Sequence, residues 1–109
     1  MTQDLQEQVK QALTEQSFRE ATILQLEKDF HRCGLDLKAN EQTDLLQTIQ
    51  SCISGIANTQ LQQLIYLIDI PEQFFLSLAG KEHFQQEISE VILMREALKV
   101  YLRTQFSAP

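Results

Sequence analysis

Residues 82–105, EHFQQEISEVILMREALKVYLRTQ, decide the fold, because they contain neither glycine nor proline and repeat apolar residues at helical spacing. A helix of this length spans about 35 Å at about 1.5 Å per residue. A compact domain of this chain's size is about 34 Å across, from a radius of gyration near 13 Å. The stretch therefore predicts one long C-terminal helix that runs from end to end of the molecule.

This helix carries two apolar stripes on opposite sides. One comprises Phe84, Ile88, Val91, Ile92, Leu98 and Leu102, and the other comprises Leu93, Met94, Ala97, Val100 and Tyr101. An ordinary surface helix has a single apolar stripe, so two stripes predict burial on two sides. Either a central position in the fold or a partner chain would supply the second cover.

Shorter helices are predicted upstream from apolar periodicity and helix-start signals. They are residues 3–14, residues 18–33 after a capping box at Ser17 and Glu20, a helix capped by Asn40, a helix opened by Thr59 and Gln62, and a short helix between Pro71 and Gly80. The segment 60–69 is apolar nearly all round, which places it with the last helix at the centre of the core.

No segment shows the alternating apolar and polar pattern of a strand, and no linker or repeat divides the chain. The expected fold is therefore all-α, a compact irregular bundle of five to six helices with a long C-terminal helix. We expect one domain over residues 1–109, with 1–14 as a peripheral helix of thin apolar stripe and 107–109 frayed.

Charge and composition argue against several classes of function. The formal net charge of -6 repels phosphate backbones, so nucleic-acid binding is disfavoured. The start of the chain lacks a signal-peptide pattern and no apolar run could span a membrane, which predicts a cytoplasmic protein without membrane contact. Cys33 and Cys52 lack metal-site spacing and are expected as reduced packing residues.

No catalytic or metal-binding motif is present, so we expect no enzymatic activity, no cofactor and no metal. Glu27 and His31 are four residues apart on one helix, but the paired Glu-x-x-His signature of di-iron bundles is absent. Glycine-flanked serine and phosphate-binding glycine loops are also missing. Residues 64–78 weakly resemble a helix-turn-helix, but the second helix offers only Gln73 and Ser77 for reading bases.

Arg95 stands within the first apolar stripe, between Ile92 and Leu98. Because an unpaired buried guanidinium is costly, we expect a buried ion pair with Asp69 or Asp44.

Excess apolar helix surface without a chemical motif indicates a protein-interaction or assembly module, either homodimeric or bound to another protein. The candidate interface is either a homodimer surface of Leu93, Met94, Ala97 and Tyr101 or a surface for another protein that contains Phe74 and Phe75. The alternatives are a helical bundle that binds an apolar small molecule between its helices and, with less support, a DNA-binding helix-turn-helix protein.

Overall fold

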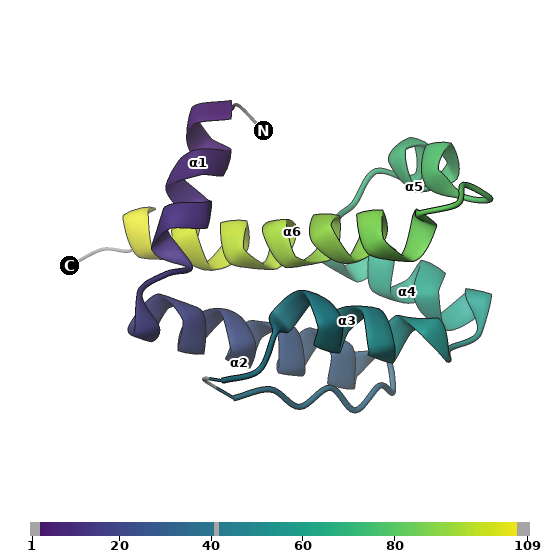
Figure 1. The fold of residues 1–109 in the computed structure, drawn as a ribbon, viewed down its shortest axis with the longest axis horizontal. Helices are drawn as coiled ribbons and strands as arrows, with labels where there is room; N and C mark the ends of the chain where they lie inside the picture. The colour runs from purple at the N-terminus through teal and green to yellow at the C-terminus, as the bar shows by residue number, and fades with distance from the viewer. Residues whose placement is uncertain (1–2, 41, 107–109) are drawn as a thin grey trace.

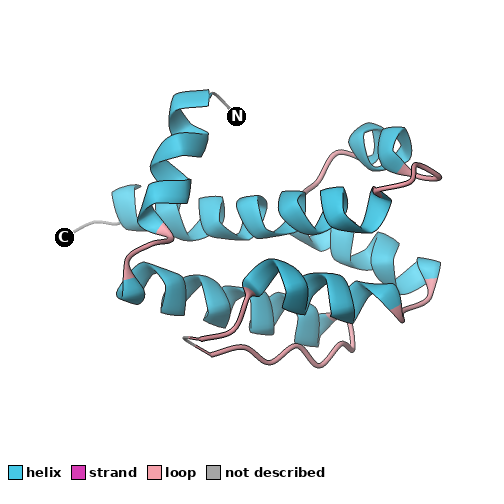
Figure 2. Cartoon of the chain, in the orientation of Figure 1, coloured by secondary structure: helices cyan, strands magenta, loops and turns pink. Residues whose placement is uncertain are grey.

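The computed structural model describes residues 3–40 and 42–106, and this part of the chain is all-α with no strand. Its six helices are α1 (Gln3–Ala12), α2 (Gln16–Arg32), α3 (Leu45–Ser54), α4 (Asn58–Ile68), α5 (Glu72–Leu78) and α6 (Phe84–Phe106) (Figures 1 and 2). The predicted bundle of five to six helices with a long C-terminal helix is therefore confirmed. The expected fraying of 107–109 lies outside the described residues.

Helix α6 is the central element of the fold. Figure 1 shows it crossing the body, with α2 and α3 along one side and α1 and α5 on the other. Ile88 and Ile92 of the first stripe are fully buried, and Ala97 and Val100 of the second are also buried within the chain. A central position thus supplies cover for both stripes over much of their length.

Helix α1 covers the C-terminal half of the second stripe. Val9 is completely buried and packs with Ala97 and Leu98 of α6, while Leu5 and Leu13 lie partly buried beside them. This small cluster is separate from the main core, which α2, α3, α4, α5 and α6 build together. Figure 1 shows the first turns of α1 standing away from the other helices.

Three predicted helix starts are wrong. Helix α4 begins at Asn58 after the N-cap Ala57, so Thr59 lies inside the helix and does not open it with Gln62. Helix α2 begins at Gln16, after Glu15 in extended conformation, so Ser17 and Glu20 form no capping box. The Glu15 carbonyl already accepts the first helical hydrogen bond, from the Arg19 amide at 2.9 Å. The helix therefore begins before Ser17.

Helix α3 is capped by Asp44, four residues after the expected Asn40. The Asp44 carboxylate accepts a hydrogen bond from the Gln47 amide at 3.2 Å, whereas the Asn40 side chain accepts one from the Gln42 amide at 2.9 Å in a tight turn. An asparagine side chain can cap a helix or stabilise a turn, and the Asn40 side chain stabilises the turn. Arg19 of α2 donates hydrogen bonds to the carbonyls of Asn40 and Thr43, which fastens the turn to the body.

Helix α4 is less buried than its apolar sequence predicts. Its inner face holds Leu61, Leu64, Ile65 and Ile68, but Tyr66 is 87% exposed. The helix ends at Asp69, whose left-handed backbone (φ 68°) lets its amide satisfy a carbonyl of the last turn. Pro71 follows and starts α5, as the sequence predicts.

Among the helices of the described residues, none combines the length and the apolar character that crossing a membrane requires.

Candidate functional site

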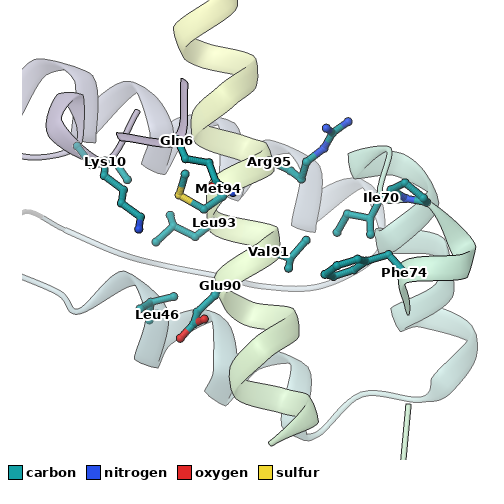
Figure 3. Close-up of a pocket in the computed structure, with 12 residues that line it drawn as sticks. Gln6, Lys10, Leu46, Ile70, Phe74, Glu90, Val91, Leu93, Met94 and Arg95 are labelled. Carbon is teal, nitrogen blue, oxygen red and sulfur yellow. The ribbon is translucent and has the colours of Figure 1, made fainter. Parts of the chain in front are cut away.

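A groove with a volume of about 710 Å³ lies on the face of the molecule where α1, α3 and α5 border α6 (Figure 3). Its floor is the stretch of α6 between the part that α1 covers and the part that α5 covers. Its apolar lining comprises Leu13, Leu46, Ile70, Pro71, Phe74, Val91, Leu93 and Met94. The hollow is open to solvent rather than enclosed between helices.

The groove displays apolar side chains that the fold leaves incompletely covered. Phe74 is 44% exposed and Leu46 is 38% exposed, and Met94 and Val91 are partly buried. In Figure 3, Phe74 and Leu46 lie on opposite sides of α6, with Val91 and Leu93 between them. Contiguous exposed apolar surface of this kind marks binding sites more often than scattered single residues do.

Charged side chains stand at the edges of the groove. Lys10 of α1 and Arg95 of α6 contribute positive charge, and Glu90 of α6 contributes negative charge. Figure 3 shows Glu90 at the opposite end of the labelled α6 stretch from Arg95. The groove therefore has an apolar floor and charged residues of both signs at its edge, where Lys10 Nζ lies 4.0 Å from Glu7 Oε1 and Arg95 pairs with Asp69.

Arg95 pairs with Asp69, one of the two carboxylates named from the sequence. Its Nη2 donates to the Asp69 carbonyl at 2.9 Å and lies 3.4 Å from Oδ2. The pair is at the surface, with the two side chains 31% and 91% exposed, so the expected burial is wrong. The reason is local: Asp69 ends α4 in a left-handed conformation that leaves its carboxylate in water.

The structure divides the residues of the two candidate interfaces differently from the sequence analysis. Phe74, Leu93 and Met94 meet in the groove. Ala97 is completely buried under α1, and Tyr101 is partly buried there, with its hydroxyl donating to Gln8 Oε1 at 2.9 Å. Phe75 turns inward and packs edge-on against Phe84, with ring centroids 5.6 Å apart.

The rest of the notable sequence features offer little chemistry. The described residues contain no group of three or more His, Cys, Asp or Glu side chains able to hold a metal ion. Cys33 and Cys52 are free, and burial raises the pKa of each thiol. Helix α5, the second helix of the helix-turn-helix interpretation, exposes Gln73, Phe74 and Ser77 without a basic residue.

Comparison with protein-family models, with curated proteins and with solved structures gives no match. Functional inference for this chain therefore depends on its own residues.

A second unusual feature lies on the other side of α6, where two carboxyl groups are buried against α2. Asp29 is 2% exposed and Glu96 is 0% exposed. Lys99 reaches both, with Nζ 3.0 Å from Asp29 Oδ2 and 3.4 Å from Glu96 Oε1. Gln25 of α2 donates a further hydrogen bond to Asp29 Oδ2 at 3.0 Å.

Glu96 retains its proton in this setting. Burial is the main cause that raises its pKa, and contact with Asp29 adds to it, so the pKa reaches about 8 despite Lys99. Among the described residues, no backbone or side-chain group donates a hydrogen bond to either carboxyl oxygen of Glu96. A protonated Glu96 would supply a hydroxyl donor for the Asp29 carboxylate, whose proximity adds to burial in raising the pKa of Glu96.

Asp29 is the ionised member of the pair. Burial alone would raise its pKa, but hydrogen bonds from Glu96, Gln25 and Lys99 outweigh that effect and lower it. The cluster thus holds one proton, one carboxylate and one ammonium group, and its net charge is zero. We refer to Asp29, Glu96 and Lys99 as the acid cluster.

The acid cluster was missed in the sequence, although a signal for it exists. Glu96 stands four residues from both Ile92 and Val100, and Asp29 stands beside Phe30 and three residues after Leu26. A carboxylate at helical spacing within an apolar stripe is the pattern that reveals it. Glu27 and His31, the pair that the sequence analysis considered, lie on another side of α2, where His31 is exposed.

Proposed function

We propose that this chain is a protein-interaction module whose groove holds an apolar, helical segment of another protein. The observation that carries the proposal is the groove itself, in which Phe74, Val91 and Met94 remain accessible although the fold has a complete core elsewhere. Grooves lined by apolar side chains on several helices are a recurrent receptor for amphipathic helices.

A segment of a different protein fits the groove better than a second copy of the chain. In a twofold dimer the same patch of both copies meets, so two hollows would face one another and leave a void. The proposed occupant is convex, as a helix with an apolar face is. A homodimer through the second stripe would also have to displace α1, since Ala97 is completely buried beneath it.

Charge at the groove specifies the occupant further. Lys10 and Arg95 line the groove with one acidic residue, Glu90. Their ion pairs with Glu7 and Asp69 are solvated and weak, so an acidic residue beside the apolar face of the segment can compete for the two cations. The net charge of the chain opposes an acidic partner at long range. At physiological ionic strength, however, the Debye length is about 8 Å, so the charges at the groove dominate once contact is made.

Binding of synthetic helical peptides tests the proposal. The probes are fluorescent amphipathic helices with one leucine face and with polar faces that are acidic, neutral or basic, measured by fluorescence anisotropy. We expect the acidic peptide to bind most tightly. Phe74→Asp should weaken it at least tenfold, since burying a phenylalanine contributes about 1.5 to 3 kcal/mol and tenfold corresponds to about 1.4 kcal/mol.

Leu24→Asp is the matched control, because Leu24 is 66% exposed on α2 and lies outside the groove. This variant should bind as the parent does. Failure of every peptide to bind, or equal weakening by both substitutions, would contradict the proposal. Self-association that Met94→Asp abolishes would instead favour a second copy as the occupant. If small apolar compounds, but no peptide, displaced a hydrophobic dye bound to the parent, the ligand-binding alternative would be favoured.

A further inference from the structure

The acid cluster joins three helices through two almost completely buried carboxyl groups and the partly exposed Lys99. Glu96 and Lys99 belong to α6, and Asp29 belongs to α2. Lys99 also donates a hydrogen bond to the carbonyl of Leu67 in the last turn of α4, at 3.4 Å. A change within the cluster therefore acts on the contacts that α6 makes with both α2 and α4.

Ordinary packing does not account for this arrangement. Replacing a buried charged cluster by apolar side chains is often neutral or stabilising, so the cluster is weak evidence for stability as such. A leucine or methionine at the position of Glu96 would match the apolar residues before and after it in the stripe. The cluster instead makes the charge buried at the α2–α6 interface depend on one proton.

We propose that Asp29 and Glu96 share a single proton that holds α2 against α6, and that loss of this proton loosens the interface. In the closed form Glu96 is protonated and donates to the Asp29 carboxylate, and Lys99 balances the one remaining negative charge. When Glu96 releases its proton to solvent, two carboxylates face one ammonium group and the buried cluster gains a net charge of -1.

Loss of the proton also removes a hydrogen bond. The hydroxyl donor of Glu96 disappears, and the two carboxylates repel one another at close range in a medium that screens them poorly. The ionised Glu96 can regain water only if α2 and α6 separate locally. The closed form is thus favoured at acidic and neutral pH, and the loosened form at alkaline pH.

The groups that act on Glu96 are on the two helices that hold it. They are the Asp29 carboxylate of α2 and the Lys99 ammonium of α6. Gln25 of α2 faces Asp29, and Arg103 of α6 donates to Gln25 Oε1 at 3.1 Å, so this cation lies at the edge of the cluster. Helix α4 contributes the Leu67 carbonyl.

Direct titration of Glu96 tests the inference on the unaltered protein. Carboxyl carbons of glutamate are labelled with ¹³C and their NMR shifts are followed with pH, with the Glu96 signal assigned by its absence in Glu96→Gln. We expect one glutamate to titrate near pH 8, well above the usual value of 4.5. A Glu96 signal that titrates with the exposed glutamates would overturn the proposal.

Unfolding by urea measures whether this proton is linked to folding. Because the native state holds a proton that the unfolded state has released, the unfolding equilibrium constant of the parent should rise by up to tenfold per pH unit as the pH increases from the unfolded pKa of 4.5 toward about 8. Glu96→Gln retains a side-chain N–H donor for Asp29 and carries no proton to lose. Its unfolding constant should change far less over the same range.

Glu90→Gln is the control, because Glu90 is exposed on the same helix. This variant should keep the pH dependence of the parent. Equal pH dependence in the parent and in Glu96→Gln would contradict the inference. If Glu96→Gln did not fold, the presence or absence of one glutamate that titrates near pH 8 in the parent would still decide the question.

Discussion

The two sides of α6 reverse the usual relation between polarity and burial. On the side that faces α2, the carboxyl groups of Asp29 and Glu96 are almost completely buried. On the side that faces the groove, Phe74 is 44% exposed and Met94 is accessible. Buried polar groups and exposed apolar patches are the informative departures from the common pattern, so each side of this helix points to a property beyond folding.

The comparison separates two kinds of use. The charged side is sealed by the chain itself, and its chemistry can respond only to protons and to movement of the helices. The apolar side is open, and it can respond to another molecule. Four predictions test this contrast, ordered by the expected effect of the group that each one concerns, and the fourth adds a substitution in the core as its reference.

The first prediction concerns the cation of the acid cluster. Lys99→Met should destabilise the protein by about 2 to 4 kcal/mol at neutral pH, because it leaves the Asp29 carboxylate buried without a positive charge. The lower part of that range allows for the Lys99 side chain being 34% exposed. Urea unfolding provides the measurement, and a loss below about 1 kcal/mol would show that the cluster behaves as a surface pair.

The second prediction concerns pH. Glu96 has a raised pKa, so its contribution to stability is complete below the unfolded value of 4.5 and is lost as pH rises toward about 8. The slope can reach about 1.4 kcal/mol per pH unit. Asp29 has a lowered pKa, so its contribution is lost as pH falls below the usual value of 3.8.

Together these two groups favour maximum stability in the mildly acidic range. Thermal unfolding over a pH series at fixed ionic strength would measure the curve. A maximum on the alkaline side of neutrality would contradict this assignment of the proton. Glu96→Gln should flatten the alkaline branch and leave the acid branch in place.

The third prediction concerns the ion pair at the edge of the groove. Arg95→Met and Arg95→Ala should each change the free energy of unfolding by about 1 kcal/mol or less, since the pair with Asp69 is solvated. Denaturation midpoints of both variants beside Lys99→Met would provide the comparison. If an Arg95 variant cost as much as Lys99→Met, the distinction between the two sides of α6 would fail.

The fourth prediction concerns the groove floor. Phe74→Ser should alter stability by no more than about 1 kcal/mol, whereas Ile92→Ala on the buried side of α6 should cost about 2 to 5 kcal/mol. Calorimetry on both variants would show whether Phe74 serves the core. A loss for Phe74→Ser that approached the Ile92 value would mean that the groove is part of the packed interior.

Much of the fold could be predicted from the sequence because helical periodicity is a local property. The long helix was expected at 82–105 and is observed at Phe84–Phe106. The start of α5 at Pro71 was also predictable, since proline both ends one helix and suits the first turn of the next. Helix starts that depend on a choice between Asn40 and Asp44 were not, because both residues can cap.

The candidate sites were less predictable because they depend on which helices meet. The two apolar stripes on α6 predicted either a central position for the helix or a partner chain. No pattern in the sequence indicated that α1 would cover Ala97 and leave Met94 accessible. The acid cluster requires Asp29 to lie close to Glu96, although the two residues are 67 positions apart in the sequence. Periodicity cannot supply such a pairing.

Methyl NMR of the groove tests the central claim most directly. The chain contains only two methionines, Met1 and Met94, so selective ¹³C-methyl labelling yields two signals and one of them reports on the groove floor. On addition of the acidic amphipathic peptide, the account predicts a saturable shift of the Met94 methyl signal that Phe74→Asp suppresses and Leu24→Asp leaves unchanged. A Met94 signal that stays in place while the peptide binds would contradict it.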